Sequence, residues 1–417
     1  MCIFRKMLLF RLILTKMKDY LMKILVINAG SSSIKFTLYE SDDEKQLAKG
    51  LVERINTPKA SMRYGNCRGQ QLSKDVSANS YEAAISEICL ALIDKDAGVI
   101  DNLTEIKGIG HRVVHGGAEI SGAVRINDDV KQVILDCFSL APLHNPPNYE
   151  GIEACERLLP QIPMVAVFDT AFHQTMPPAA YTYAIPHEIA QKHKIRRYGF
   201  HGTSHNYVAV TTASILGLEF NELKIITAHL GNGCSITAVQ RGQVVDTSMG
   251  LTPLEGLVMG TRCGDIDPAV VIFLRRLGFS LDEVDNMLNK SSGLFGLAGI
   301  GSNDMRDIIR EMEGGSVSAG LAINVFVHRL VKYIGAYTAV MNGIDALVFT
   351  AGIGENVPLI RSRVCSKLSC LGIRINEEHN KSNELIISEE NTKPVVLVVP
   401  TNEELMIARE TIRLLKH

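Results

Sequence analysis

Two stretches of this chain share one pattern, and that pattern constrains the fold more than any other feature of the sequence. An apolar run leads into a short turn of Gly, Ser and Asn, and an alternating apolar and polar run follows. The pattern occupies residues 24–38 and again residues 225–239. Each copy predicts a β-hairpin. Two hairpins about half a chain apart predict a duplicated architecture whose halves each present a turn to a shared cleft.

The turns of these two hairpins have the composition of an anion-binding loop. The second turn reads Gly231-Asn232-Gly233, and glycine has no Cβ, so backbone N–H groups there can approach a phosphate closely. An ordinary hairpin tip is the simpler interpretation, and the pattern alone leaves both open. The first turn, residues 30–35, lacks the Gly-Lys-Ser/Thr order of a P-loop. Lys35 is therefore either a phosphate contact or an exposed strand lysine.

The remaining sequence alternates between strand and helix signals. Apolar runs predict strands at 106–114, 164–168, 346–350 and 395–399, and spacing predicts helices at 81–93, at 150–159 and at the end of the chain. Residues 141–148 contain three prolines, which predicts irregular structure. Strands that alternate with helices and end in polar or glycine residues predict an α/β fold with its functional groups at strand ends.

Length, charge and cysteine content narrow the class of protein. A chain of 417 residues predicts two or three domains, and 46% hydrophobic residues provide a large core. A net charge of −2 gives no electrostatic basis for binding nucleic acid or an anionic membrane. Nine cysteines without a Cys-x-x-Cys pair argue against a disulfide framework and against a structural zinc site. A reducing cytoplasm fits this usage.

The first 21 residues have their own character. Residues 7–14 are apolar apart from one arginine, but the run is too short to span a bilayer. Residues 15–19 do not provide the small residues of a signal-peptide cleavage site. Because Met22 stands directly before the first predicted strand, we expect residues 1–21 to be a dispensable extension outside the fold.

Polar side chains at strand ends and in glycine-rich segments are the candidates for chemistry. Asp169 directly follows a predicted buried strand, and it is either a cap for the next segment or a catalytic carboxylate. Arg112 and Arg262 are flanked by glycine and apolar residues, which suits bidentate contact with a phosphate or carboxylate. His201 precedes His205 by four residues, but no Glu partner supports a metal site, so we predict that His201 is a donor to a transferred group.

Two later segments are candidates for nucleotide and metal binding. Residues 352–356, Gly-Ile-Gly-Glu-Asn, follow a predicted strand and would let a nucleotide lie against the backbone, although the motif is weak alone. Glu403 stands at the start of the last helix. It is the candidate ligand for Mg²⁺, a hard cation that takes few protein oxygens and keeps several waters.

Taken together, the motifs of this chain resemble those of a known family. From about residue 22 to the end they run in one order: residues 25–36 (LVINAGSSSIKF), 111–117 (HRVVHGG), 168–173 (FDTAFH), 198–205 (YGFHGTSH), 229–233 (HLGNG), 246–250 (DTSMG), 260–262 (GTR), 264–268 (GDIDP), 352–356 (GIGEN) and 401–404 (TNEE). The set closely resembles the acetate kinase family, within the superfamily of acetate and sugar kinases, actin and heat-shock chaperone ATPases. So many ordered motifs are highly specific.

The resemblance implies a fold, an activity and partners. The expected fold is a pair of ribonuclease H-like domains, the duplicated actin-like ATPase fold, with an active-site cleft between them. Residues 22–170 with 404–417 would form one domain, and residues 171–403 the other. The expected activity is reversible phosphoryl transfer between ATP and acetate, giving ADP and acetyl phosphate, with Mg²⁺ or alternatively Mn²⁺. A cytoplasmic homodimer with no nucleic-acid or membrane partner is expected.

The resemblance also implies a role for each matching residue. Asn28 and Glu403 would hold the metal, and Lys35 would contact the nucleotide. Asp169 would be the catalytic acid/base, Arg112 the substrate contact, and His201 and Arg262 the stabilisers of the transition state. The small-acid pocket would comprise Val114, Leu143, Phe200 and Pro253. The ATP-contacting residues would be His229, Leu230, Gly231, Asn232, Gly233, Asp304, Met305, Arg306, Gly352, Ile353, Gly354, Glu355 and Asn356.

Elementary chemistry agrees with these roles in all but one respect. A carboxylate nucleophile needs no strong base, so the protein has to position the reactants and neutralise charge during an in-line transfer. Asp169 would then orient groups more than move protons, because acetate is already ionised at neutral pH.

Two alternatives remain open from the sequence. Within the same family, a propionate or butyrate kinase differs by one or two methylenes, worth only about 1–3 kcal/mol in an apolar pocket. From another class, an actin-like ATPase switch would use the same hairpins without a small-acid substrate.

Overall fold

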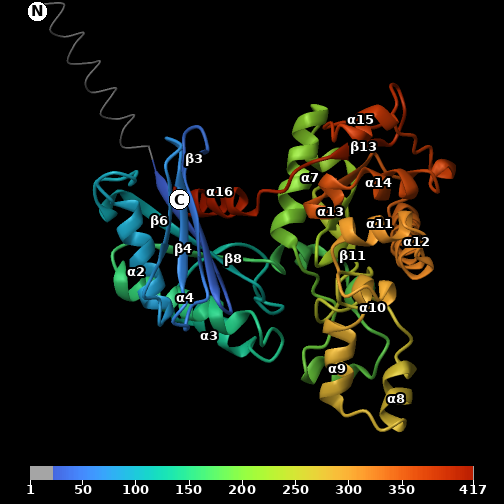
Figure 1. Ribbon diagram of the computed structural model, residues 1–417, viewed down its shortest axis with the longest axis horizontal. Coiled ribbons are helices and arrows are strands. Elements are labelled where there is room, and N and C mark those ends of the chain that lie inside the picture. The colour runs from blue at the N-terminus through green and yellow to red at the C-terminus, as the bar shows by residue number, and fades with distance from the viewer. Residues whose placement is uncertain (1–21, 417) are drawn as a thin grey trace, which may run out of the picture. The chain divides into compact units, whose positions relative to one another are not determined.

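The computed structural model describes residues 22–416, and the predicted extension, residues 1–21, lies outside the described residues. Within that range the chain forms two compact units (Figure 1). Unit 1 comprises residues 22–171 and 403–416, and unit 2 comprises Phe172–Asn402. Each unit is built on a β-sheet of its own.

The sheet of unit 1 has eight strands in the order β5-β4-β3-β2-β1-β6-β8-β7. They are β1 (Lys23–Gly30), β2 (Ser33–Glu40), β3 (Lys45–Glu53), β4 (Ser61–Asn66), β5 (Gln71–Asp75), β6 (Ile106–Val113), β7 (Val124–Arg125) and β8 (Met164–Phe168). Strands β1, β6 and β8 are parallel, and β2 is antiparallel to β1. The first predicted hairpin and the strands predicted at 106–114 and 164–168 are therefore confirmed.

Helices cover both faces of this sheet. They are α2 (Tyr81–Leu92), α3 (Asp128–Asp136), α4 (Asn145–Leu158) and α16 (Glu403–Leu415), with a 3-10 turn η1 (Leu103–Glu105). Alternate residues of strand β6 face the two helical layers. Ile109 packs in the core cluster that includes α2 and α4, whereas Gly110 faces α16, where an added Cβ would lie 2.5 Å from Thr411 Oγ1. The glycine lets α16 pack closely on the sheet.

One prediction for this unit is wrong. Residues 141–148 were expected to be irregular, but α4 begins at Asn145 and includes Pro146 and Pro147 in its first turn. The first N–H groups of a helix have no intrahelical partner, so proline costs nothing there and its fixed φ suits the helix. The proline-rich segment is the start of the helix rather than a barrier before it.

The sheet of unit 2 has five strands in the order β11-β10-β9-β12-β13. They are β9 (Lys224–Leu230), β10 (Cys234–Gln240), β11 (Gln243–Thr247), β12 (Ala346–Thr350) and β13 (Val395–Val398). Strands β9, β12 and β13 are parallel, and β10 is antiparallel to β9. This repeats the arrangement β3-β2-β1-β6-β8 of unit 1. The duplicated ribonuclease H-like fold and the second predicted hairpin are confirmed.

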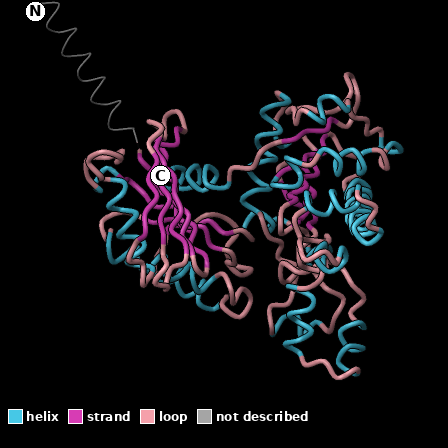
Figure 2. Tube along the Cα trace, viewed as in Figure 1, coloured by secondary structure: helices cyan, strands magenta, loops and turns pink. Residues whose placement is uncertain are grey.

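The remaining elements of unit 2 are mostly helices (Figure 2). They are η2 (Ala171–Thr175, whose first residue lies in unit 1), α5 (Pro178–Tyr181), α6 (His187–Lys192), α7 (Gly202–Leu216), η3 (Phe220–Glu222), α8 (Ala269–Arg276), α9 (Leu281–Lys290), α10 (Gly293–Ala298), α11 (Met305–Glu313), α12 (Val317–Val340), α13 (Ala351–Asn356), α14 (Pro358–Cys365), η4 (Ser369–Leu371) and α15 (Glu377–Lys381). Helix α12 is long and apolar enough to cross a membrane by length and composition alone. It packs against α10, α11, α14 and the sheet.

Candidate active site

In unit 1, the ends of three parallel strands bring predicted site residues together. Asp169 follows β8 and is 1% exposed. Arg112, on β6, donates from Nε to Asp169 Oδ1 at 3.2 Å and from Nη2 to Asp169 Oδ2 at 2.5 Å. Its Nη1 donates to Asn28 Oδ1, on β1, at 3.3 Å. The bidentate pair fixes the plane of the guanidinium at this edge of the sheet.

Glu403, the first residue of α16, joins this group. Its Oε2 lies 3.9 Å from Arg112 Nε. Burial and, to a smaller extent, the nearby Asp169 carboxylate raise the pKa of Glu403 to about 7, although Arg112 and Lys35 oppose that rise. Lys35 faces Asn28 across the β1–β2 hairpin. The structure therefore gathers Asn28, Asp169 and Glu403 around the Arg112 guanidinium, and the fifth predicted residue, Lys35, lies beside Asn28.

These side chains fit a hard divalent cation. The amide oxygen of Asn28 and the carboxylate of Glu403 are oxygen donors, the ligand type that Mg²⁺ prefers. No group of three or more His, Cys, Asp or Glu that could hold a metal occurs among residues 22–416. A cation held by so few protein ligands would complete its shell with water and substrate phosphates, as Mg²⁺ usually does.

Two buried asparagines that sequence reasoning missed hold this edge in place. Asn148 accepts from Val114 N at 3.0 Å and donates to Ala29 O at 2.6 Å. Asn145 accepts from His115 N at 3.0 Å and donates to His115 O at 2.9 Å. Both belong to the first turn of α4, so the proline-rich turn ties the ends of β1 and β6 together. The sequence signal that could have indicated them is their position: both asparagines flank the Pro146-Pro147 pair.

In unit 2, His201 starts α7 in a strained conformation. It is the N-cap residue, with φ 58° and ψ 26° in the left-handed region. That region costs a residue with a Cβ about 1–2 kcal/mol, and such strain concentrates at functional sites. Its Nδ1 lies 2.9 Å from Ser235 Oγ, and its ring stacks on His229 with centroids 4.2 Å apart.

The glycine turn between β9 and β10 brings His201 and Arg262 together. A Cβ built on Gly233 would lie 3.3 Å from His201 Nε2 and 3.6 Å from Arg262 Nη1. Arg262 Nη1 donates to Pro253 O at 3.0 Å. Within residues 22–416, no carboxylate forms an ion pair with Arg262, and burial lowers its pKa. Arg262 is thus a partly buried cation beside the turn, and no carboxylate within the described residues is paired with it.

A cavity of about 500 Å³ lies beside this turn. The three predicted ATP-contacting segments all contribute to its lining, which comprises Gly231, Asn232, Asn303, Asp304, Met305, Arg306, Gly352, Ile353, Asn356 and Val357. Asn303, which sequence reasoning missed, donates to Asn232 Oδ1 at 2.7 Å. The segments come from the β9–β10 turn, the start of α11 and α13, so residues far apart in sequence form one pocket.

The other predicted ATP-contacting residues lie outside that lining. Leu230 is fully buried in β9, and His229 bonds through Nδ1 to Ser204 Oγ at 2.8 Å. Glu355 turns its carboxylate toward the backbone, accepting from Ala351 N at 2.7 Å and Thr401 N at 3.1 Å. Gly354 is buried in α13. These residues are neighbours in sequence of the lining residues, and their contacts as nucleotide ligands stay a prediction.

The four predicted acid-pocket residues divide between the units. Val114 and Phe200 are buried, at 4% and 3% exposure, whereas Leu143 is 67% exposed. Pro253 contributes the carbonyl that Arg262 contacts. Their shared role as a small-acid pocket stays a prediction.

A buried arginine that the sequence did not indicate fixes one wall of the cavity. Arg361, on α14, is fully buried. Its Nη1 donates to Gly354 O at 2.7 Å and to Glu355 O at 2.9 Å, the end of α13. Its Nε and Nη2 donate to Asn380 Oδ1 at 2.8 Å and Asn383 Oδ1 at 2.6 Å. The guanidinium connects α13 to α15 through neutral acceptors.

Two ribonuclease H-like units, one with an oxygen-rich ion-pair group and one with a nucleotide-sized cavity, place this chain in the class of actin-like phosphotransferases and ATPases. The particular family follows from comparison with known proteins. The chain belongs to the Acetokinase family, whose profile matches residues 23–409, so the resemblance inferred from the motifs is confirmed.

The relatives support this assignment over nearly the whole chain. The acetate kinase of Clostridium novyi is 52% identical over 393 residues, 94% of this chain and 98% of that protein. The acetate kinase of Coprothermobacter proteolyticus is 53% identical over 398 residues, 95% and 99% of the two chains. Among solved structures, Porphyromonas gingivalis acetate kinase has a TM-score of 0.91 and 43% identity, covering 94% of this chain and all of its own. A Francisella tularensis propionate kinase has a TM-score of 0.87 and 46% identity, covering 94% and 99%.

Proposed function

We propose that the protein is a phosphotransferase that moves a phosphoryl group reversibly between ATP and acetate, giving ADP and acetyl phosphate. One observation carries the proposal: the Gly233 turn places His201 and Arg262 beside the cavity lined by the three predicted nucleotide segments. A transferring phosphoryl group spreads negative charge over three oxygens. A nearby cation and an imidazole donor stabilise that charge most in the transition state.

Each unit contributes groups to this reaction. In unit 1, Arg112 binds the acetate carboxylate, and Asp169 holds the guanidinium in place through the bidentate pair. Because acetate is ionised at neutral pH, Asp169 has no proton to remove. In unit 2, Arg262 and His201 stabilise the group in transfer. We propose residues 22–170 with 404–417 and residues 171–403 as the two functional domains, with bounds one residue from those of the two units at each junction. Substitution of a site residue in either domain should therefore lower turnover.

Asn28 and Glu403 would hold Mg²⁺. The ion supplies neutralisation of the nucleotide's phosphate oxygens when bound. Two measurements on Glu403→Gln test this assignment. We expect Mg²⁺-dependent activity to fall and ATP binding without metal to stay unchanged. Parallel titration with Mn²⁺ determines which ion the site uses better.

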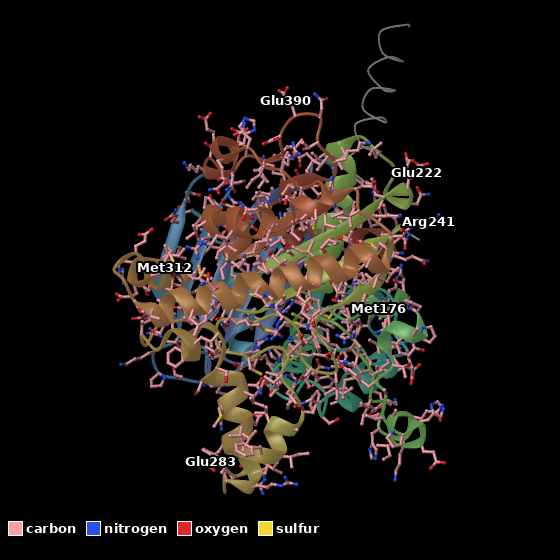
Figure 3. All side chains as sticks on the ribbon, turned by 90° about the vertical axis from the view of Figure 1, so that its right-hand side faces the viewer. Met176, Glu222, Arg241, Glu283, Met312 and Glu390 are labelled. Carbon is pink, nitrogen blue, oxygen red and sulfur yellow. The ribbon has the colours of Figure 1, made fainter. Side chains whose placement is uncertain are left out.

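An apolar surface on unit 2 supports the proposal of a homodimer. Seven exposed large apolar side chains gather on α8, on α9 and beside them: Ile266, Val270, Ile272, Phe273, Leu277, Phe279 and Leu281. Glu283, on α9, marks this part of the unit in Figure 3. Exposed patches of this kind mark association sites. Sedimentation of the wild type and of Phe273→Glu tests the proposal, and a monomeric wild type would contradict it.

We also propose that the protein is a soluble cytoplasmic enzyme.

A hydroxamate assay for acyl phosphate with purified protein tests the function directly. We expect the highest kcat/KM with acetate, then propionate, then butyrate. A preference for propionate would assign the protein to the activity named for the Francisella structure. Formation of ADP at the same rate without any acid would instead support the ATPase switch.

A further inference from the structure

A chain of hydrogen bonds inside unit 2 ends at His201. Thr227 Oγ1, on β9, lies 2.7 Å from His205 Nδ1 on α7. His205 Nε2 lies 2.7 Å from Ser235 Oγ on β10. Ser235 Oγ lies 2.9 Å from His201 Nδ1. His205 is fully buried, and each of its ring nitrogens lies within hydrogen-bond distance of a hydroxyl.

The burial of this chain fixes the direction of its hydrogen bonds. Thr227, His205 and Ser235 are each 0% exposed, and buried hydroxyl protons are donated to an acceptor. His205 Nδ1 is the one side-chain partner of the Thr227 hydroxyl among residues 22–416. Thr227 must therefore donate to His205 Nδ1, because the opposite direction would leave its proton without an acceptor.

The remaining protons follow from that first assignment. Burial holds the pKa of His205 well below its usual value, so the ring is neutral and carries one proton. Since Nδ1 accepts, that proton is on Nε2 and is donated to Ser235 Oγ. Ser235 has one proton, and its other partner is His201 Nδ1, which must accept it.

The surroundings of His201 disfavour a second proton on its ring. His229 stacks on it, and Arg262 Nη1 approaches the same glycine of the β9–β10 turn as His201 Nε2 does. His173 is the other imidazole of the cluster, with its ring 5.7 Å from that of His205. A positive charge on His201 would face the Arg262 cation, and protonated Nδ1 would compete with the hydroxyl that points at it.

We propose that Thr227, His205 and Ser235 are positioning residues that hold His201 as a neutral imidazole with its proton on Nε2. That N–H faces the Gly233 turn, and His201 then donates to the transferred phosphoryl group without becoming a cation. The inference rests on the proposed function for the use of this donor, but the tautomer itself is a property of unit 2 alone.

Nitrogen NMR of the ¹⁵N-histidine-labelled full chain, without substrates, reads this tautomer directly. We expect a protonated, pyrrole-type Nε2 and an unprotonated, pyridine-type Nδ1 for His201 near neutral pH, with the signals assigned by their loss in His201→Gln. A protonated Nδ1, or protonation of both nitrogens, would overturn the proposal.

Thr227→Val keeps the shape of the side chain and removes the hydroxyl that sets the direction. We expect a mixture of the two His201 tautomers and a kcat about fivefold lower, the size of one net hydrogen bond, with KM for ATP unchanged. Thr227→Ser should restore both. Thr237→Val is the matched control, since Thr237 pairs with Thr227 across the hairpin but bonds Thr247. A wild-type histidine spectrum in Thr227→Val would refute the role of the chain.

The spectrum separates this inference from the proposed function. If His201 has the expected tautomer and His201→Ala keeps wild-type kcat, the role of His201 in transfer fails and the tautomer assignment stands. If His201→Ala loses kcat but the wild-type ring carries its proton on Nδ1, the role stands and the positioning chain is wrong.

Discussion

The two units share the order of five strands, but the arginines at their candidate sites have different surroundings. In unit 1, Arg112 forms a bidentate pair with Asp169 and lies 3.9 Å from a second carboxylate, Glu403. In unit 2, Arg262 contacts a carbonyl and a methionine sulfur, and Arg361 contacts carbonyls and amides. Other arginines of unit 2 do pair with carboxylates, as Arg197 does with Glu255, but among residues 22–416 neither Arg262 nor Arg361 forms such an ion pair.

This difference separates positioning from charge stabilisation on one duplicated fold. An arginine paired with carboxylates is fixed in orientation, but most of its field is cancelled. An arginine solvated by dipoles keeps its net charge, and in a partly desolvated site that charge interacts strongly with an anion. Arg262 is therefore suited to stabilise a transferring phosphoryl group, whereas Arg112 is suited to hold a carboxylate in one geometry.

The largest effect is expected for Arg262→Ala. Loss of the uncompensated cation should lower kcat by about 10²–10³-fold, and KM for ATP should change much less. Thermal stability should be unchanged or slightly higher, because a partly buried charge without an acid partner is removed. Steady-state kinetics and calorimetry measure both, with the exposed Arg374→Ala as control. Wild-type turnover in Arg262→Ala would remove it from the site.

Arg112→Ala should lower kcat by about 10²-fold and also destabilise unit 1. Removing the guanidinium leaves the Asp169 carboxylate buried without its cation, which typically costs about 3–5 kcal/mol. The double variant Arg112→Ala/Asp169→Asn should recover stability but not turnover. Urea unfolding of the wild type, the two single variants and the double variant measures the coupling free energy between Arg112 and Asp169. If the double variant were as unstable as the single one, the pair would not be the source of the loss.

The sequence predicted the fold, and it predicted which candidate residues lie together at strand ends better than it predicted the residues that support them. Hairpins at 24–38 and 225–239 follow from local periodicity, and strand-end residues such as Asp169 follow from the α/β pattern. Asn148 and Arg361 do not, because their roles depend on contacts 119 and 22 residues away along the chain. The α4 error has the same origin: proline was weighed as a breaker, although position in the first helical turn decides its effect.

Arg361→Met tests the neutral arginine environment of unit 2 away from the reacting group. The carbonyls of Gly354 and Glu355, at the end of α13, would lose their donors, so the wall of the proposed nucleotide cavity should become less well ordered. We expect KM for ATP to rise about tenfold, equivalent to about 1.4 kcal/mol, with kcat reduced less. Arg363→Met, two residues along α14 and without an ion pair among residues 22–416, is the matched control. An equal loss in both variants would indicate general destabilisation.

Glu403 provides the smallest effect and a test of the acidic environment in unit 1. Its pKa of about 7 lies above the ordinary value of 4.5, so the folded protein binds a proton that the unfolded chain releases between those values. The free energy of unfolding should therefore fall as pH rises through that window, and the contribution of Glu403 to it should be lowest above pH 7. Relative to Glu403→Gln, the metal-free wild type should lose at least about 1 kcal/mol, or about 2–4 °C in Tm, between about pH 5 and pH 8.

Adding Mg²⁺ above pH 7 should restore the Tm of the wild type but not that of the variant, because only a carboxylate offers the ion a charged ligand. Parallel pH profiles of Tm for the two proteins would show instead that Glu403 is not protonated by its surroundings, and the contrast between the two units would then rest on Asp169 alone.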